Sequence, residues 1–106
     1  MAWVLLLTAG LLEIVWAFTM KLSEGFTRLG PAVLTIFAML ASFTLLSISM
    51  RTLPLGTAYT VWTGIGALGA FGVGVLALGE PLTTGRAAAA VLIVTGLILM
   101  KLSTTA

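Results

Sequence analysis

The sequence predicts an all-α membrane protein that crosses the bilayer four times, and three observations lead to this. Of 106 residues, 60% are hydrophobic and only 8% are charged, with a mean hydropathy of +1.24. Soluble domains average about 45–50% apolar and about 25% charged residues, and so short a chain has too small an interior to bury the excess. One membrane-spanning helix takes about 20 residues, so four helices with short loops account for the whole chain.

Short polar breaks separate the four apolar runs. Every charged residue except Glu13 lies in or beside a break, and Pro31, Pro54 and Pro81 each follow one. Proline is tolerated at a helix start because an amide there has no helical acceptor. We expect a single four-helix transmembrane domain over residues 1–106, with helices over about 2–21, 31–50, 55–78 and 84–102. These segments are apolar on all sides, which favours lipid-embedded helices over a soluble bundle.

The first span contains Glu13, the one charged residue away from the breaks. It lies about 17 Å along the helix, near the middle of a hydrocarbon core about 30 Å thick. A carboxylate is costly there and typically marks an ion or proton path, and loss of hydration favours its neutral form. No cationic side chain reaches this depth from another span, so the counter-charge must be a proton or a cationic ligand. The alternative role is a protonated glutamate that joins helices by hydrogen bonds.

Four further residues fit a cation site around Glu13. Trp16 lies three residues later on the same helix face, and Ser42 reaches a similar depth from the second span. Tyr59 and Trp62 share one face of the third span at a shallower level. Their rings offer cation–π surfaces, and their N–H and O–H groups can orient the carboxylate. Taken singly, each of the four also suits packing or an interfacial belt.

The third span is rich in glycine, which indicates close packing, a bend, or both. Glycine lets helices approach closely in lipid, and paired small residues are frequent kink sites. We expect a hinge at Gly64 and Gly66, with packing as the alternative. In the fourth span, the alanines of residues 87–90 and Gly96 predict a helix–helix contact surface.

The basic residues are nearly balanced between the two sides of the membrane. Arg51 and Lys101 lie on one side, and Lys21, Arg28 and Arg86 on the other. Since an excess of Lys and Arg sets orientation, near balance favours insertion in both directions and hence an antiparallel homodimer. The alternative is that a bias of one residue suffices to fix one orientation.

Several classes of function are excluded by composition. The chain has no Cys and no His, so thiolate and imidazole metal sites and histidine-based triads are excluded, and we expect neither a metal nor a cofactor. Five scattered basic residues form no patch for nucleic acid. The N-terminus lacks the basic region of a signal peptide, and we interpret it as a mature transmembrane helix.

Two stretches resemble the small multidrug resistance family: Glu13-Ile14-Val15-Trp16-Ala17, followed by Lys21, residues 25–29 and Pro31, and Gly56 to Ala67. The resemblance covers essentially the whole chain. Trp16 and the run Trp-Thr-Gly-Ile-Gly-Ala are similar to the guanidinium-exporter subtype, because the quaternary-ammonium subtype tends to have a small residue at the position of Trp16.

This resemblance implies an antiparallel, dual-topology homodimer in the bacterial inner membrane that exchanges protons for guanidinium and small substituted guanidines by alternating access. It implies a site shared by Glu13 of both subunits and surrounded by Trp16, Ser42, Tyr59 and Trp62. It also places Ala89 and Gly96 in the dimer-forming fourth helix, although relatives often have glycine at position 89. Leu22 stands where an aromatic residue is common in this subtype.

The predicted function is therefore a transporter and not an enzyme, and three alternatives stay open. The nearest is export of quaternary ammonium cations by the same fold. A proton-translocating rotor subunit also combines one membrane carboxylate with glycine-rich helices. A non-transporting membrane scaffold would use Glu13 for helix packing alone.

Overall fold

The computed structural model describes residues 1–104, which form four α-helices: α1 (Ala2–Leu22), α2 (Leu29–Ser49), α3 (Leu55–Ala77) and α4 (Thr84–Ser103). All four are long and apolar enough to cross a membrane, which confirms the all-α, four-span prediction. The expected ranges differ from these bounds by at most two residues. The difference at α2 arises because the helix begins at Leu29 and takes Pro31 into its first turn, where proline removes no helical hydrogen bond.

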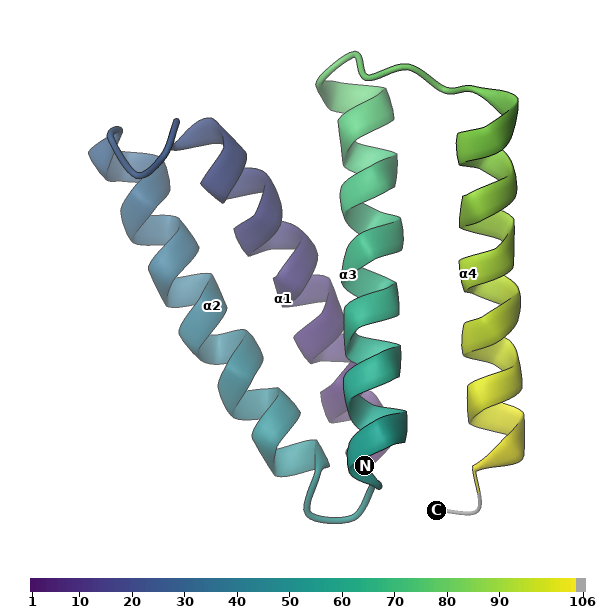
Figure 1. Cartoon of the computed structure of the whole chain (residues 1–106). Coiled ribbons are helices and arrows are strands. Elements are labelled where there is room, and N and C mark those ends of the chain that lie inside the picture. The colour runs from purple at the N-terminus through teal and green to yellow at the C-terminus, as the bar shows by residue number, and fades with distance from the viewer. Residues whose placement is uncertain (105–106) are drawn as a thin grey trace.

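Three of the helices share one core, while the fourth stands at the edge (Figure 1). Helix α1 packs against both α2 and α3, and the buried apolar side chains all come from these three helices and the α2–α3 connection. Glycine permits the close approach of α1 to α3: a Cβ on Gly10 would collide with Ile65, and one on Gly69 with Ile14. The core residues are Leu6, Ala9, Leu46, Leu53, Ala58, Val61 and Trp62.

The interface between α1 and α2 is lined by buried hydroxyl groups. Thr35, Ser42 and Ser49 recur every seven residues along α2 and are fully buried. Thr35 shares a hydrogen bond with Thr19 of α1, with 2.6 Å between their Oγ1 atoms. The Oγ of Ser42 donates to the carbonyl oxygen of Ala9 at 2.7 Å. Since hydrocarbon offers no competing partners, such bonds hold neighbouring helices in register.

Helix α4 differs from the other three because none of its described residues is buried. Its backbone approaches α3 alone. Thr83 caps its first turn by accepting a hydrogen bond from the amide of Arg86 at 3.2 Å. The two helices come close at Gly64 of α3, where a Cβ would collide with Leu97. The proposed dimer-packing positions Ala89 and Gly96 are both exposed.

The expected hinge region lies inside an unbroken helix. Helix α3 is continuous from Leu55 to Ala77, so this conformation has no break at Gly64 or Gly66. Both glycines instead lie at close approaches, to Leu97 and to Glu13 respectively. These contacts support the packing role, and the hinge stays a prediction about movement.

Candidate cation site in the helical bundle

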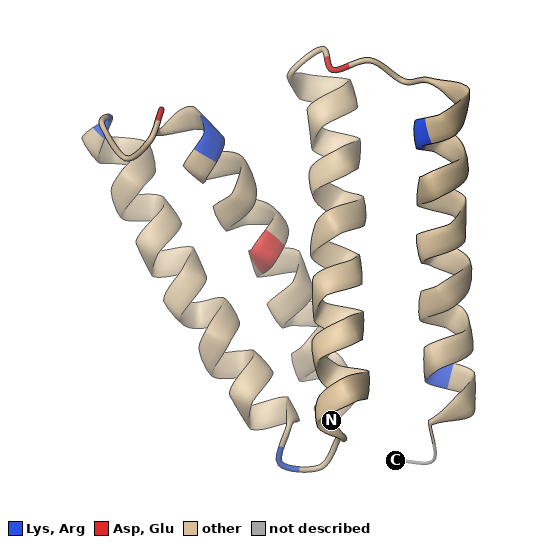
Figure 2. Cartoon of the chain, in the orientation of Figure 1, with Lys and Arg blue, Asp and Glu red and all other residues tan. Residues whose placement is uncertain are grey.

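Glu13 is the acidic residue midway along a helix, and the other two lie in the connections at one end of the bundle (Figure 2). Its side chain lies against Gly66 of α3, where a Cβ would overlap the carboxylate. Gly66 is buried, so the space for the carboxylate exists because this position lacks a side chain. The role of Gly66 beside the acid was not part of the sequence prediction.

Two buried polar atoms near this point lack a hydrogen-bond partner among the described residues. They are Oε1 of Glu13 and Nε1 of Trp16, which lie one helical turn apart on the same face of α1. An unpaired acceptor and an unpaired donor in an apolar environment each carry a desolvation penalty. Polar groups of this kind frequently mark a functional site.

Ser42 and Trp62 form a hydrogen-bonded pair beside α1. The indole Nε1 of Trp62 donates to Oγ of Ser42 at 3.0 Å, and Ser42 in turn donates to the carbonyl oxygen of Ala9. In the helical pattern this same carbonyl accepts the amide of Glu13, four residues later. The pair therefore fixes the turn of α1 that leads into Glu13, although neither group hydrogen-bonds its carboxylate in this conformation.

The aromatic residues form a continuous chain of ring contacts across three helices. Trp16 meets Phe43 edge-on with ring centroids 6.2 Å apart, and Phe43 meets Trp62 at 5.7 Å. Tyr59 continues the chain, with its centroid 5.7 Å from that of Trp62. Phe43 was missed by sequence reasoning, and its position directly after Ser42 was the one available indication. It connects Trp16 to the two aromatic residues of α3.

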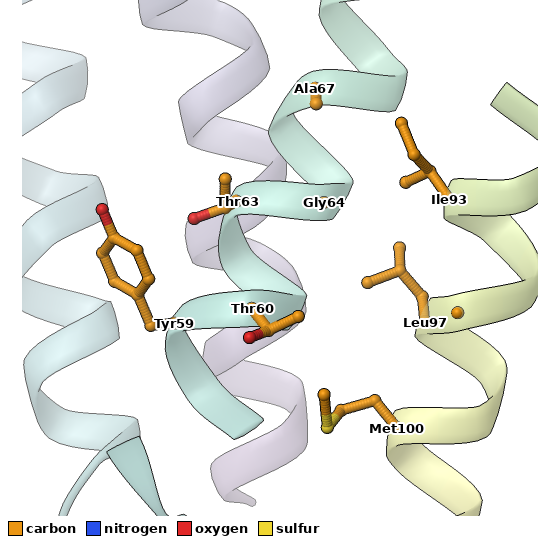
Figure 3. A pocket seen from close by; sticks show the side chains of 9 residues that line it. Tyr59, Thr60, Thr63, Gly64, Ala67, Ile93, Leu97 and Met100 are labelled. Carbon is orange, nitrogen blue, oxygen red and sulfur yellow. The ribbon is translucent and has the colours of Figure 1, made fainter. Parts of the chain in front are cut away.

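Tyr59 lies at the exposed end of this chain and borders two open cavities. One, of about 330 Å³, is lined by Phe43, Ser47 and Trp62 among others. The other, of about 510 Å³, lies between α3 and α4 (Figure 3), and its lining includes Thr63, Gly64 and Gly96. Tyr59 is 54% exposed, and its place at the entrance of a cation site stays a prediction.

The structure thus joins four of the five predicted site residues by direct contact or through Phe43: Trp16, Ser42, Tyr59 and Trp62. Glu13 shares a helix face with Trp16 but makes no hydrogen bond to any of them within residues 1–104. Within the same range, no three Asp, Glu, His or Cys side chains come together as a metal site would require. The donor set suits an organic cation or a proton.

These features define a multi-pass membrane protein with one half-buried acid midway along a helix, on the same helix face as Trp16. The family model of the Small Multidrug Resistance protein matches residues 1–93. The chain therefore belongs to the small multidrug resistance family, as its sequence motifs indicated.

Curated relatives extend along nearly the full chain. A guanidinium exporter of Citrobacter freundii is 57% identical over 104 residues, covering 98% of this chain and 99% of the relative. A guanidinium exporter of Salmonella typhimurium strain LT2 is 54% identical over 103 residues, covering 97% and 98%. One of Escherichia coli K12 is 53% identical over 104 residues, covering 98% and 99%. These relatives are exporters by name, which agrees with the prediction of a transporter rather than an enzyme.

Proposed function

We propose that this protein exports guanidinium and small substituted guanidines across the bacterial inner membrane in exchange for protons. Its relatives named guanidinium exporters support the substrate class. The observation that carries the mechanism is the carboxylate of half-buried Glu13, whose buried Oε1 atom has no protein partner within the described residues. An acid inside a membrane span without a protein counter-ion requires either a proton or a cation from outside.

Exchange follows from competition for the same oxygens. When Glu13 is protonated it carries no charge to attract a cation, and when it binds a cation the proton has left. Coupling requires that the bound species favour the change between inward-open and outward-open forms, and that the empty carboxylate does not. Cation binding is therefore expected to weaken as the pH falls, because protons occupy the site.

The shape of the acid favours guanidinium over ammonium-type cations. A carboxylate presents two oxygens in one plane, and guanidinium presents paired N–H donors in a plane at matching spacing. The unpaired indole of Trp16 lies on the same face and supplies a ring for cation–π contact. Phe43, Tyr59 and Trp62 extend an aromatic wall outward, beside which a small apolar substituent would lie.

The working unit in this proposal is an antiparallel homodimer with Glu13 of both subunits in a shared site. The lack of buried residues on α4 supports a partner on that helix, since most helices in a bundle bury one face. Near-equal loop charges support insertion in both directions. A C-terminal tag should then be reached by impermeant reagents in about half of the molecules, and a tag found on one side only would contradict the dimer.

Proteoliposomes provide the test of transport. An imposed guanidinium gradient should drive proton movement with the unmodified protein, whereas Glu13→Gln should abolish it because the amide cannot carry charge. Glu24→Gln, the same change in the exposed α1–α2 connection, is the matched control and should transport normally. Urea, which has a similar shape without the charge, should drive no proton movement.

Three outcomes would contradict the proposal: guanidinium–proton exchange by Glu13→Gln, urea carried as well as guanidinium, or quaternary ammonium cations carried in preference to guanidinium. Loss of transport in Glu13→Gln with the dimer intact would also dismiss the scaffold alternative. A dimeric mass in detergent would dismiss the rotor, which forms large rings.

A further inference from the structure

A third cavity, whose lining does not include Glu13, lies between the first turns of α1, the middle of α3 and the last turns of α4. Its volume is about 260 Å³, and it is open toward the surface of the bundle. All of its lining side chains are apolar except for the ammonium of Lys101 and the indole N–H of Trp3. The residues are Trp3, Leu7, Val61, Ile65, Leu97, Ile98, Lys101 and Leu102.

Lys101 lies in the last turn of α4 and reaches across to α1. Its Nζ lies 4.5 Å from the centroid of the Trp3 ring, within the range of a cation–π contact. No carboxylate within residues 1–104 forms an ion pair with it, and the one ion pair found there joins Arg86 to Glu80 at 3.5 Å. An ammonium has three donors, and a single ring face leaves donors for an anion.

Among residues 1–104, the charged groups at this end of the bundle are all positive. Arg51, Lys101 and the N-terminal amine lie here, and Figure 2 shows acidic residues only midway along a helix and at the opposite end. Lys and Arg near a helix end lie at headgroup depth and attract anionic lipids. With Lys101 at headgroup depth, the apolar cavity directly beside it would lie at the depth of the upper acyl chain.

We propose that this cavity binds an anionic phospholipid, with its phosphate at Lys101 and one acyl chain between α1, α3 and α4. The chemistry on both sides matches: a phosphate for an ammonium that forms no ion pair within residues 1–104, and hydrocarbon for the Leu, Ile and Val side chains. The backbones of α1 and α4 do not approach each other, so the lipid would join them. The site does not depend on what the protein transports.

Tryptophan quenching by brominated acyl chains tests this site. The protein is placed in phosphatidylcholine vesicles with increasing brominated phosphatidylglycerol, or with brominated phosphatidylcholine for comparison. The signal of Trp3 is obtained as the difference from Trp3→Phe. Phosphatidylglycerol should quench Trp3 at a lower mole fraction than phosphatidylcholine, and Lys101→Gln should reduce this preference about fivefold, the effect of one basic group at an anionic surface.

Two variants test whether the preference for phosphatidylglycerol comes from this site or from the surface charge in general. Lys101→Arg should keep the preference, because it keeps the charge. Lys21→Gln makes the same change as Lys101→Gln at the opposite end of α1 and should also keep it. Equal quenching by the two lipids, an unaltered preference in Lys101→Gln, or an equal loss in Lys21→Gln would overturn the proposal. Displacement of the lipid by inorganic phosphate would also overturn it, since that indicates a free-phosphate site.

Discussion

The two helix pairs of this protein are built in opposite ways. Between α1 and α2, hydroxyl groups are buried and hydrogen-bonded across the interface, as with Thr19 and Thr35. Between α3 and α4 there is a cavity of about 510 Å³ beside the contact of Gly64 with Leu97, and α4 buries no described residue. The α1–α2 pair is packed and hydrogen-bonded within one chain, whereas α4 has little support from its own chain.

The more tightly packed of the two helix pairs is the one that contains Glu13. The α1–α2 interface fixes the turn of α1 that precedes Glu13, through the bond of Ser42 to the carbonyl of Ala9. A carboxylate that must distinguish a planar cation from others has to be held in a defined place. Helix α4 carries no predicted substrate-binding residue, and in the proposed dimer its surface would pack against the partner subunit. Three pairs of substitutions, each pair within one helix, test this difference between the two helix pairs.

The largest effect among these is expected for Gly66→Ala. The added Cβ would overlap the carboxylate of Glu13, and overpacking at a tight contact costs about 1–3 kcal/mol. Guanidinium binding should weaken about 10- to 100-fold, measured by tryptophan fluorescence titration. Gly72→Ala is the control in the same helix, because nothing lies within 4 Å of a Cβ there. If Gly66→Ala and Gly72→Ala weaken guanidinium binding equally, the flexibility of the glycine backbone, as in a hinge, matters more than the contact with Glu13.

An intermediate effect is expected for Gly96→Leu in α4. Nothing within the chain lies within 4 Å of a Cβ at this position, so a single chain should accommodate the leucine. A partner helix packed closely on Gly96 would not, and dimerisation should weaken by about tenfold. Gly85→Leu, also in open space on α4, is the control. Dimer dissociation in detergent, followed by energy transfer between labelled subunits, measures both, and an unaltered dimer in Gly96→Leu would place the interface elsewhere.

The smallest effect is expected for Ser42→Ala, at the interface between α1 and α2. This change removes the bond to Ala9 and leaves the indole N–H of Trp62 without its acceptor, at a cost of about 1 kcal/mol. Ser49→Ala should cost less, because buried Ser49 donates only to the carbonyl of Leu46 in its own helix. Thermal unfolding in detergent measures both. If Ser49→Ala is equally destabilising, the loss reflects burial of the hydroxyl rather than the bond between helices.

The four spans and the prominence of Glu13 could be predicted from the sequence because hydrocarbon imposes simple requirements. Each span must be apolar and about 20 residues long, and a charge inside one is costly enough to be noticed without coordinates. Trp16 and the pair Tyr59 and Trp62 followed from helical spacing. The partner of each polar group could not be predicted in this way: Ser42 was expected to orient Glu13, but the structure gives it Trp62 and Ala9.

The four apolar spans, the position of the single acid within a span and the near balance of loop charges follow from the sequence alone, because each depends on residue type and position along the chain. The tertiary structure was needed to show that Gly66 rather than Gly72 makes room for Glu13. It also decided that Phe43, and not the exposed Phe37, connects Trp16 to Trp62. These assignments depend on how neighbouring helices are rotated about their axes, and that rotation is set by side-chain packing between residues far apart in the chain.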